Sequence, residues 1–152
     1  MNMKIEEEIS QTKFRNPLQK AIINVIFTSN WIQDRQQNFF KPYGITSQQF
    51  NILRILRGQY PNGISGASIK ARMMDKNSDV SRLLDRLEAK ELIEKKLSPL
   101  DKRATDVTIS SKGLDVLNEI DKKQQEFDGV IALSEDEAEQ LSDLLDKCRS
   151  RD

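Results

Sequence analysis

The hydrophobic pattern of this sequence changes from a helical to a strand-like period near residue 92, and this change narrows the choice of fold sharply. Four apolar residues before this point recur on one face of a helix viewed at about 100° per residue: Val80, Leu83, Leu84 and Leu87. Beyond it, apolar and polar residues alternate in 92–96 and again in 104–109, as in two short strands. The pattern predicts an amphipathic helix followed by a hairpin whose loop, 98–103, is long and basic at its tip.

Start signals predict three helices before this segment. Pro17 opens a long helix over 17–41, because proline suits the first turn of a helix. A T-x-x-Q capping box that begins at Thr46 opens a second helix, which runs to about Arg57. Ser65 caps a short third helix. Residues before Pro17 are weakly patterned and stay unassigned.

Further capping signals give the starts of the remaining helices. Asn77 or Ser78 caps the amphipathic helix. Ser110 caps a helix whose apolar line continues to Phe127, and a capping box at Ser134 opens the last helix. Together the elements predict a mainly α fold with a small β-hairpin wing (α+β), in which additional N- and C-terminal helices flank a winged helix-turn-helix core.

Charge is distributed unevenly along the chain. The 152 residues include 24 basic and 24 acidic ones, yet residues 1–103 carry a net charge of +7 and residues 115–152 carry −7. Such a protein can present a basic side to a polyanion and keep an acidic side away from it. Apolar residues make up only 37% of a chain of one-domain length, so we expect a single domain that gains burial by oligomerisation.

The composition gives little support to catalysis. The sequence has no histidine, which excludes imidazole-based triads and zinc ligands. It lacks glycine-rich phosphate-binding motifs, and its one cysteine, Cys148, lies on an apolar helical line where packing is the better explanation. We therefore expect no enzyme, no catalytic residue, no cofactor and no metal site. No signal segment or membrane-spanning apolar run occurs, so we expect a cytoplasmic location and no membrane partner.

The outward face of the amphipathic helix offers side chains that suit DNA. It carries Ser78, Ser81, Arg82, Asp85 and Arg86. A helix with these donors and acceptors can enter a major groove and contact base edges. The Lys102–Arg103 pair in the hairpin loop can reach the adjacent minor groove. A solvated face and an ordinary polar turn explain each part separately, but their order and spacing together favour DNA binding.

Three segments carry a resemblance to a known family: ITSQQFNILRIL, SDVSRLLDRLEAKELIEKK and DKRATDVTISSKG. They resemble the DNA-binding core of the multiple-antibiotic-resistance regulator (MarR) family, which corresponds here to residues 45–113. Asp101 and Arg103 match the family's D-x-R wing motif, and residues 110–113 resemble its T-x-x-G. Glu91 departs from the glycine that is usual in the turn after the recognition helix. The flanking helices are similar to the family only in length and position.

The resemblance implies an obligate two-fold dimer that binds double-stranded DNA. Residues 45–113 would form the winged DNA-binding lobe, and 17–41 with 111–150 the helical dimerisation region, within one domain of residues 1–152. The dimer would regulate transcription, as a repressor, from a pseudo-palindromic operator whose half-sites lie about 10 bp apart. The residue pattern agrees, because the flanking helices carry more apolar residues than one small core needs.

The resemblance also assigns roles to individual residues. Four match the positions at which the family reads bases: Ser78, Asp79, Ser81 and Arg82. Arg82 suits guanine, whereas Asp79 either accepts from cytosine or favours the helix dipole, the second role being preferred. Arg86 either contacts phosphate or pairs with Asp101, and Arg103 is the expected minor-groove probe. Three lysines are expected to neutralise phosphates: Lys95, Lys96 and Lys102.

Many members of the family are released from DNA by small aromatic ligands that bind between the dimer helices and the DNA-binding lobe. The aromatic residues near that crevice are Trp31, Phe39, Phe40, Tyr43 and Phe50. Phe50 is better explained by core packing, because it forms a hydrophobic staple with Ile45. For the others, a ligand pocket and core packing both stay open. Two other functions also stay open: a winged-helix module that binds protein, and a ligand-binding helical dimer without DNA binding.

Overall fold

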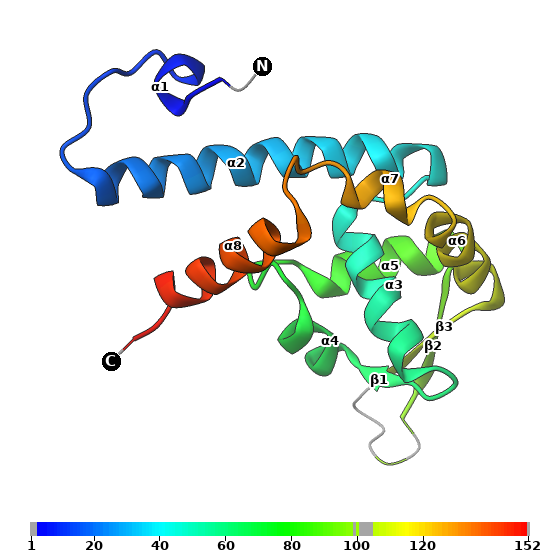
Figure 1. Ribbon diagram of the computed structural model, residues 1–152. Coiled ribbons are helices and arrows are strands. Elements are labelled where there is room, and N and C mark those ends of the chain that lie inside the picture. The colour runs from blue at the N-terminus through cyan, green and yellow to red at the C-terminus, as the bar shows by residue number, and fades with distance from the viewer. Residues whose placement is uncertain (1–2, 99, 101–104, 152) are drawn as a thin grey trace.

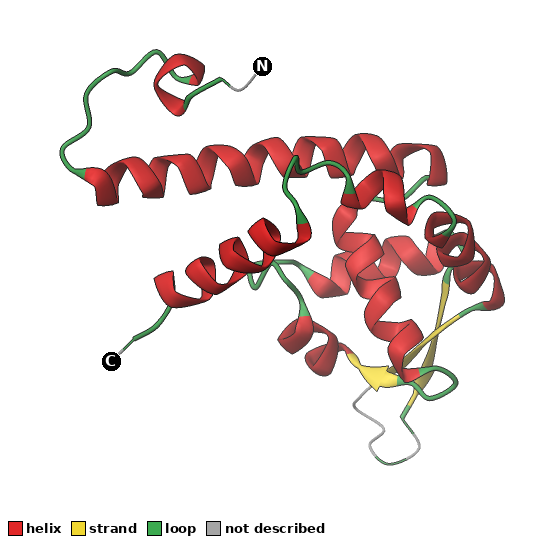
Figure 2. Ribbon diagram, viewed as in Figure 1, coloured by secondary structure: helices red, strands yellow, loops and turns green. Residues whose placement is uncertain are grey.

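The computed structural model describes residues 3–98, 100 and 105–151 (Figure 1). Its elements in chain order are α1 (Ile5–Glu8), α2 (Pro17–Phe40), η1 (Lys41–Tyr43), α3 (Ser47–Gln59), β1 (Ile64–Ser65), α4 (Gly66–Arg72), α5 (Val80–Ala89), β2 (Ile93–Leu97), β3 (Thr105–Ile109), α6 (Ser111–Asp121), α7 (Gln124–Asp128) and α8 (Glu135–Cys148). Figure 2 shows the three strands gathered at the end of the molecule away from α2. The predicted mainly α fold with a small β-hairpin wing is confirmed.

The sheet forms around β3, which lies between β1 and β2 and pairs antiparallel with both. Strands β2 and β3 are the predicted hairpin, in a register that pairs Ile93 with Ile109. The sequence did not predict β1, because two residues are too few to show an alternating pattern. Gly63, just before β1, allows a close approach to β3, since a Cβ there would lie 3.1 Å from Thr108 Cγ2.

The core of the winged part lies where α3, α4, α5 and α6 meet the sheet. The predicted apolar side of α5 is at most 7% exposed and consists of Val80, Leu83, Leu84 and Leu87. The neighbouring elements contribute almost completely buried residues to the same cluster: Ile52, Leu53, Leu56, Ile69, Val107, Leu117 and Ile120. Because this side of α5 is turned inward, the opposite side faces solvent.

Two helices, α2 and α8, which we call the helical arms, bury little of their apolar surface. Figure 1 shows α2 extending well beyond the winged part, with α8 on the same side of the molecule. Across the described residues, α2 buries only Phe40 and α8 buries none of its residues. The exposed apolar side chains of the arms, 41–75% exposed, are Leu18, Ile22, Val25, Ile26, Leu141 and Leu144. None of the described helices has both the length and the apolar character needed to cross a membrane.

The N-terminal residues, which the sequence left unassigned, fold back onto α2. Ile5 of α1 is buried, and Glu6 forms an ion pair with Lys20 of α2. The hydrogen bond from Lys20 lowers the pKa of the Glu6 carboxyl. The Lys20 ammonium also lies 5.8 Å from the centroid of the Phe14 ring. Lys20 thus ties this segment to the start of the long helix.

Most of the predicted helix starts are confirmed, but the start of α5 is wrong. Four predicted caps accept a hydrogen bond from the backbone N–H three residues later: Thr46, Ser65, Ser110 and Ser134. The N-cap of α5 is Asp79 instead of Asn77 or Ser78, because its carboxylate accepts from the Arg82 N–H at 3.2 Å. Three adjacent polar residues could each have served as the cap, so the local sequence did not decide between them.

Two predictions about the C-terminal half are also wrong. The helix predicted from residue 110 to Phe127 breaks at Lys122–Lys123, which separates α6 from α7. The break is associated with packing of the Phe127 ring against Phe39, at a centroid separation of 5.1 Å. Cys148 is exposed instead of packed, and no residue of α8 is buried within this chain.

Candidate nucleic-acid interface

The solvent-facing side of α5 carries the predicted polar side chains Ser81, Arg82, Asp85 and Arg86, all exposed. Two open grooves border the start of the helix. One lies between the starts of α4 and α5 and is lined by Gly66, Ala67, Lys70 and residues 77–81. The other is lined by Gln48, Asp79, Arg82, Leu83 and Arg86. The first turns of α5 are therefore accessible, which a helix entering a DNA groove requires.

The four residues predicted to read bases have different surroundings. Ser81 and Arg82 project from the exposed side of α5. Asp79 is exposed as well, but its carboxylate caps the helix, which favours the dipole role over a base contact. Ser78 is only 5% exposed, and its hydroxyl accepts a hydrogen bond from Gln48 Nε2 at 3.5 Å. Ser78 is therefore part of the support beneath the helix, and the prediction that it lies on the outward face is wrong.

Polar side chains of α3 hold the turn between α4 and α5. Gln48 Nε2 donates to Asp75 Oδ2 at 3.3 Å as well as to Ser78. Asn51, which is buried, accepts a hydrogen bond from the Met74 N–H at 3.0 Å. The roles of Gln48 and Asn51 were not predicted, because a polar residue within a helix carries no signal of a partner more than 20 positions away.

The turn after α5 takes the left-handed conformation that favours glycine, although Glu91 occupies it with φ of 61°. The Leu92 N–H donates to the Leu87 carbonyl at 3.0 Å, and the Glu91 N–H donates to the Glu88 carbonyl at 2.9 Å. These two bonds form a Schellman motif, and the buried side chains of Leu87 and Leu92 provide its hydrophobic contact. The missing family glycine thus leaves the turn intact but strained.

The T-x-x-G-like segment at residues 110–113 binds this turn directly. The Ser110 hydroxyl donates to the Glu91 carbonyl at 2.7 Å and accepts from the Gly113 N–H at 3.1 Å. A Cβ on Gly113 would lie 2.4 Å from the Leu92 carbonyl oxygen, so no residue with a side chain fits here unless the backbone shifts. A hydroxyl at residue 110 and a glycine at residue 113 therefore let α6 start in contact with the end of α5.

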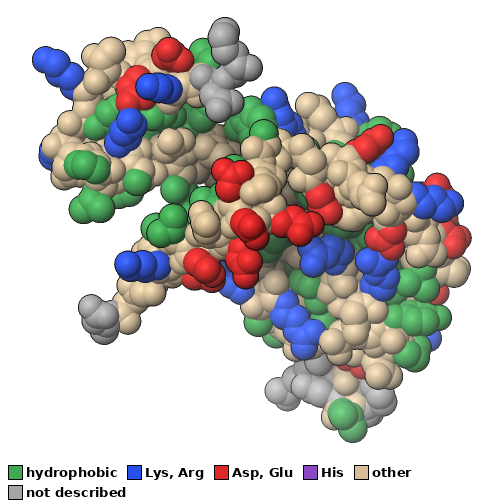
Figure 3. Space-filling view, in the orientation of Figure 1, with side chains coloured by type: hydrophobic (Ala, Val, Ile, Leu, Met, Phe, Trp, Pro, Cys, Tyr) green, Lys and Arg blue, Asp and Glu red, His purple; other side chains and the backbone are tan. Residues whose placement is uncertain are grey.

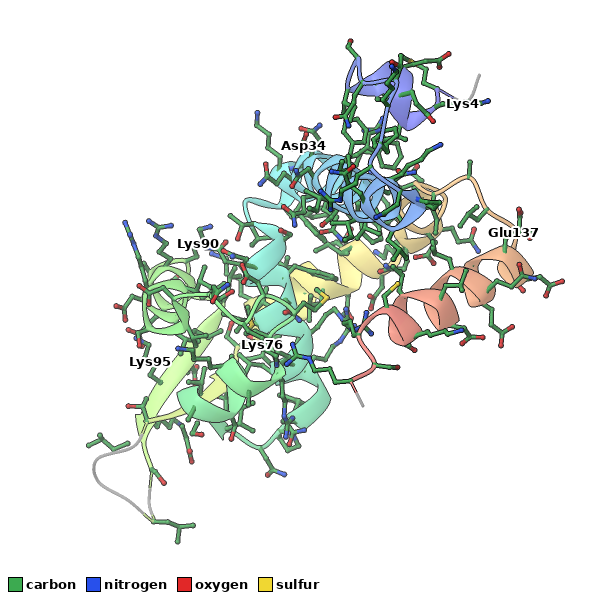
Figure 4. The ribbon with its side chains drawn as sticks, turned by 90° about the vertical axis from the view of Figure 1, so that its left-hand side faces the viewer. Lys4, Asp34, Lys76, Lys90, Lys95 and Glu137 are labelled. Atoms are coloured by element: carbon green, nitrogen blue, oxygen red, sulfur yellow. The ribbon has the colours of Figure 1, made fainter. Side chains whose placement is uncertain are left out.

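The predicted basic residues of the wing also have different surroundings. Lys95, on β2, forms ion pairs with Asp85 and, at 3.9 Å, with Glu88 (Figure 4). Its ammonium is thereby held against the outer side of α5. Lys96 is exposed, on the opposite face of the strand. The predicted wing residues Asp101, Lys102 and Arg103 lie outside the described residues.

The structure brings most of the predicted aromatic residues together at the end of α2. The Phe39 ring lies 5.2 Å from Phe40 and 6.1 Å from Tyr43, measured between centroids. Phe40 is 1% exposed and packs on Phe50 at 4.4 Å, so both belong to the core. Phe127 joins this group, although the sequence analysis assigned it no such role. The remaining candidate makes a different contact: the Arg35 guanidinium stacks 3.6 Å from the centroid of Trp31.

Acidic side chains gather on a different part of the surface from α5. Figure 3 shows Asp and Glu side chains clustered over α8. Glu137 in the first turn of α8 accepts a hydrogen bond from the Ser134 N–H at 3.0 Å, which lowers the pKa of its carboxyl. The acidic C-terminal part of the sequence thus places a cluster of carboxylates on the surface of α8.

Comparisons with known proteins agree with this geometry. A model of the MarR family matches residues 45–105. The chain is 30% identical over 118 residues to the HTH-type transcriptional regulator MhqR of Bacillus subtilis, over 75% of this chain and 79% of that protein. It is 29% identical over 108 residues to the HTH-type transcriptional regulator MgrA of Staphylococcus aureus, over 71% and 72% of the two chains.

A solved structure extends the likeness to the helical arms. The crystal structure of a mutant MarR from E. coli complexed with operator DNA has a TM-score of 0.74 and 24% identity, over 97% of this chain and 100% of that one. The named relatives are regulators of transcription and not enzymes. The family model, the identity to MhqR and the shared fold together show that this chain belongs to the MarR family of transcriptional regulators.

Proposed function

We propose that this protein binds double-stranded DNA as a homodimer at a pseudo-palindromic operator and represses transcription there. The observation that carries the proposal is the two-sided character of α5, whose apolar side is buried while Ser81, Arg82 and Arg86 face solvent. A helix that is packed on the core by its apolar side and carries hydrogen-bonding side chains on the other suits the major groove and can discriminate base pairs. The operator DNA named for the E. coli MarR structure supports the same ligand class.

The helical arms support the homodimer. Leu18, Ile22 and Val25 recur at helical spacing along α2 and are each at least 47% exposed. Figure 3 shows apolar side chains on the sides of α2 and α8 that face each other across a notch. A two-fold dimer would cover the same stripe on both copies. We therefore assign 17–41 and 111–150 to dimerisation and 45–113 to the DNA-binding lobe of a single domain.

Within this dimer the basic residues divide the work of recognition. Arg82 donates to guanine, and Arg86 contacts phosphate or pairs with Asp101. Lys96 and Lys102 neutralise phosphates, while Arg103 enters the minor groove. Lys95 contributes less to phosphate binding, because its ammonium is already paired with acidic side chains of α5.

We also propose that a small aromatic effector binds at the edge of the aromatic group and releases the DNA. Phe39 and Tyr43 are half-buried there, and they lie at the joint between α2 and α3. The only tryptophan, Trp31, lies on the same helix as Phe39 and serves as a fluorescence probe. Titration with aromatic acids is expected to change its emission saturably and to weaken DNA binding. No saturable change would count against an effector at this position.

Selection of DNA fragments from the source genome, followed by footprinting, tests the function itself. We expect a protected palindrome with half-sites about 10 bp apart and an affinity that falls steeply with salt. Arg103→Ala is expected to reduce the log-log salt slope by about 1 if the residue neutralises one phosphate. A protein-binding module would show no salt-steep DNA affinity. A ligand-binding dimer without DNA binding would bind aromatic acids but protect no site.

A further inference from the structure

Lys90 ends α5 and binds the segment that joins α2 to α3. Its Nζ atom donates to the Gly44 carbonyl at 2.6 Å and to Gln49 Oε1 at 3.0 Å. Gly44 follows η1 with φ of 69°, and the chain changes direction there from α2 toward α3. Figure 4 labels Lys90 beside this joint. One side chain therefore connects the end of α5 to the joint between α2 and α3.

Both ends of this connection are held by other contacts. Gln49 is 2% exposed, and its Oε1 also accepts from the Thr46 N–H at 3.1 Å within the capping box of α3. The Lys90 backbone N–H donates to the Arg86 carbonyl at 3.2 Å. The Lys90 carbonyl accepts from Lys112 Nζ of α6 at 3.1 Å. The lysine thus spans two well-supported points, and its cationic head suits the carbonyl and amide oxygens it meets.

We propose that Lys90 is a positioning residue for operator recognition. Elsewhere α5 packs on α3, α4 and β2, which hold it inside the winged part. The Lys90 bonds add a contact with the joint that leads to the long helical arm, through Gly44 and through Gln49 in the first turn of α3. They therefore set the placement of α5 relative to α2, and with it the distance and angle between the two copies of α5 in a dimer. This inference rests on the proposed DNA-binding homodimer.

The spacing of half-sites measures this geometry, because the dimer must match two successive grooves. The probes are the best duplex that the wild-type protein selects from a random-sequence pool, and the same duplex with one base pair inserted at its centre. Lys90→Met keeps most of the aliphatic stem and removes the ammonium. We expect it to reduce the affinity ratio between the two duplexes by about three- to tenfold, the range that corresponds to the net contribution of one typical hydrogen bond.

Two variants make the comparison specific. Lys90→Arg is expected to restore most of the ratio, since a guanidinium offers donors to the same two oxygens. Lys112→Met removes a lysine that binds a carbonyl at the same end of α5 but comes from α6, and it is expected to leave the ratio unchanged. The salt slope of Lys90→Met is also expected to stay at the wild-type value, because a positioning residue neutralises no phosphate.

The outcomes separate this inference from the proposed function. A wild-type protein that selects no duplex overturns both. A wild-type protein that discriminates spacing, together with Lys90→Met and Lys90→Gln proteins that discriminate equally well, overturns only the role of Lys90. A salt slope reduced by one would identify Lys90 as a phosphate contact and also overturn it. Lys90→Gln has a shorter, uncharged side chain that also loses the ammonium, so it provides the same test if the Met variant does not fold.

Discussion

The winged part and the helical arms differ in how much of their apolar surface one chain can cover. In the winged part, the apolar side of α5 is at most 7% exposed, and the same chain supplies all of its cover. In the arms, Leu18 is 75% exposed and Leu144 is 60% exposed. The first region is covered within a single copy, whereas the second leaves much of its apolar surface exposed. Recognition and assembly can therefore be perturbed separately.

The largest effect is expected from Gly113→Ala, which acts on the winged part. The added Cβ would meet the Leu92 carbonyl oxygen at 2.4 Å, so either α6 or the turn after α5 must move. We expect a loss of about 3 kcal/mol in the free energy of unfolding, measured in urea. Gly58→Ala is the control, because a Cβ there meets nothing within 4 Å and alanine favours the helix. Equal stability of the two variants would contradict the packing of this joint.

Ile22→Glu tests the arms without touching the core. Ile22 is 60% exposed in one chain, so a carboxylate there costs a monomer little. In a two-fold dimer the substitution places a charge in the apolar interface from both copies, and we expect the dimer Kd to rise at least about 100-fold. Sedimentation equilibrium measures this change, with Asn24→Glu on the opposite side of α2 as the control. An unchanged Kd for Ile22→Glu would exclude this stripe from the interface.

Arg82→Ala is expected to leave both regions folded and to alter only recognition. Its guanidinium is exposed on α5, while its backbone N–H binds Asp79 and stays in place. We expect discrimination at one base-pair position to fall by about 1–3 kcal/mol, measured with a series of base-substituted duplexes. Arg54→Ala, on α3 beside the Phe50 ring, should not change discrimination. A uniform loss over all duplexes would instead indicate a phosphate contact for Arg82.

The smallest effect is expected from Glu91→Gly, which stabilises the winged part alone. Glu91→Gly removes the strain of a left-handed residue, and its exposed ion pair with Lys112 at 3.8 Å contributes little. We expect a gain of about 0.5–1 kcal/mol in the free energy of unfolding, with no change in dimer Kd. Glu88→Gly, inside α5, is expected to lose about 1 kcal/mol. A loss of stability in both glycine variants would contradict a left-handed backbone conformation at Glu91.

The local sequence predicted those features that depend on neighbours along the chain. The caps Thr46, Ser65 and Ser110 were correct because each binds an N–H only three residues away. The cap at Asp79 was missed, because three polar residues are adjacent there and the sequence does not show that Ser78 is buried beside Gln48, 30 positions earlier. Strand β1 was missed for a similar reason, since only its pairing with β3 makes two residues a strand.

Some features of the candidate site also follow from the local sequence, whereas others depend on how the elements pack. The two sides of α5, the hairpin and the separation of charge all follow from periodicity and composition, which the sequence alone determines. Only the tertiary structure decided that Lys95 pairs with Asp85, and that Lys90 reaches Gln49 across 41 positions. The physical reason is that a hydrophobic period shows which side of an element is buried, but not which elements cover it. The partners of a polar side chain depend on how those elements pack.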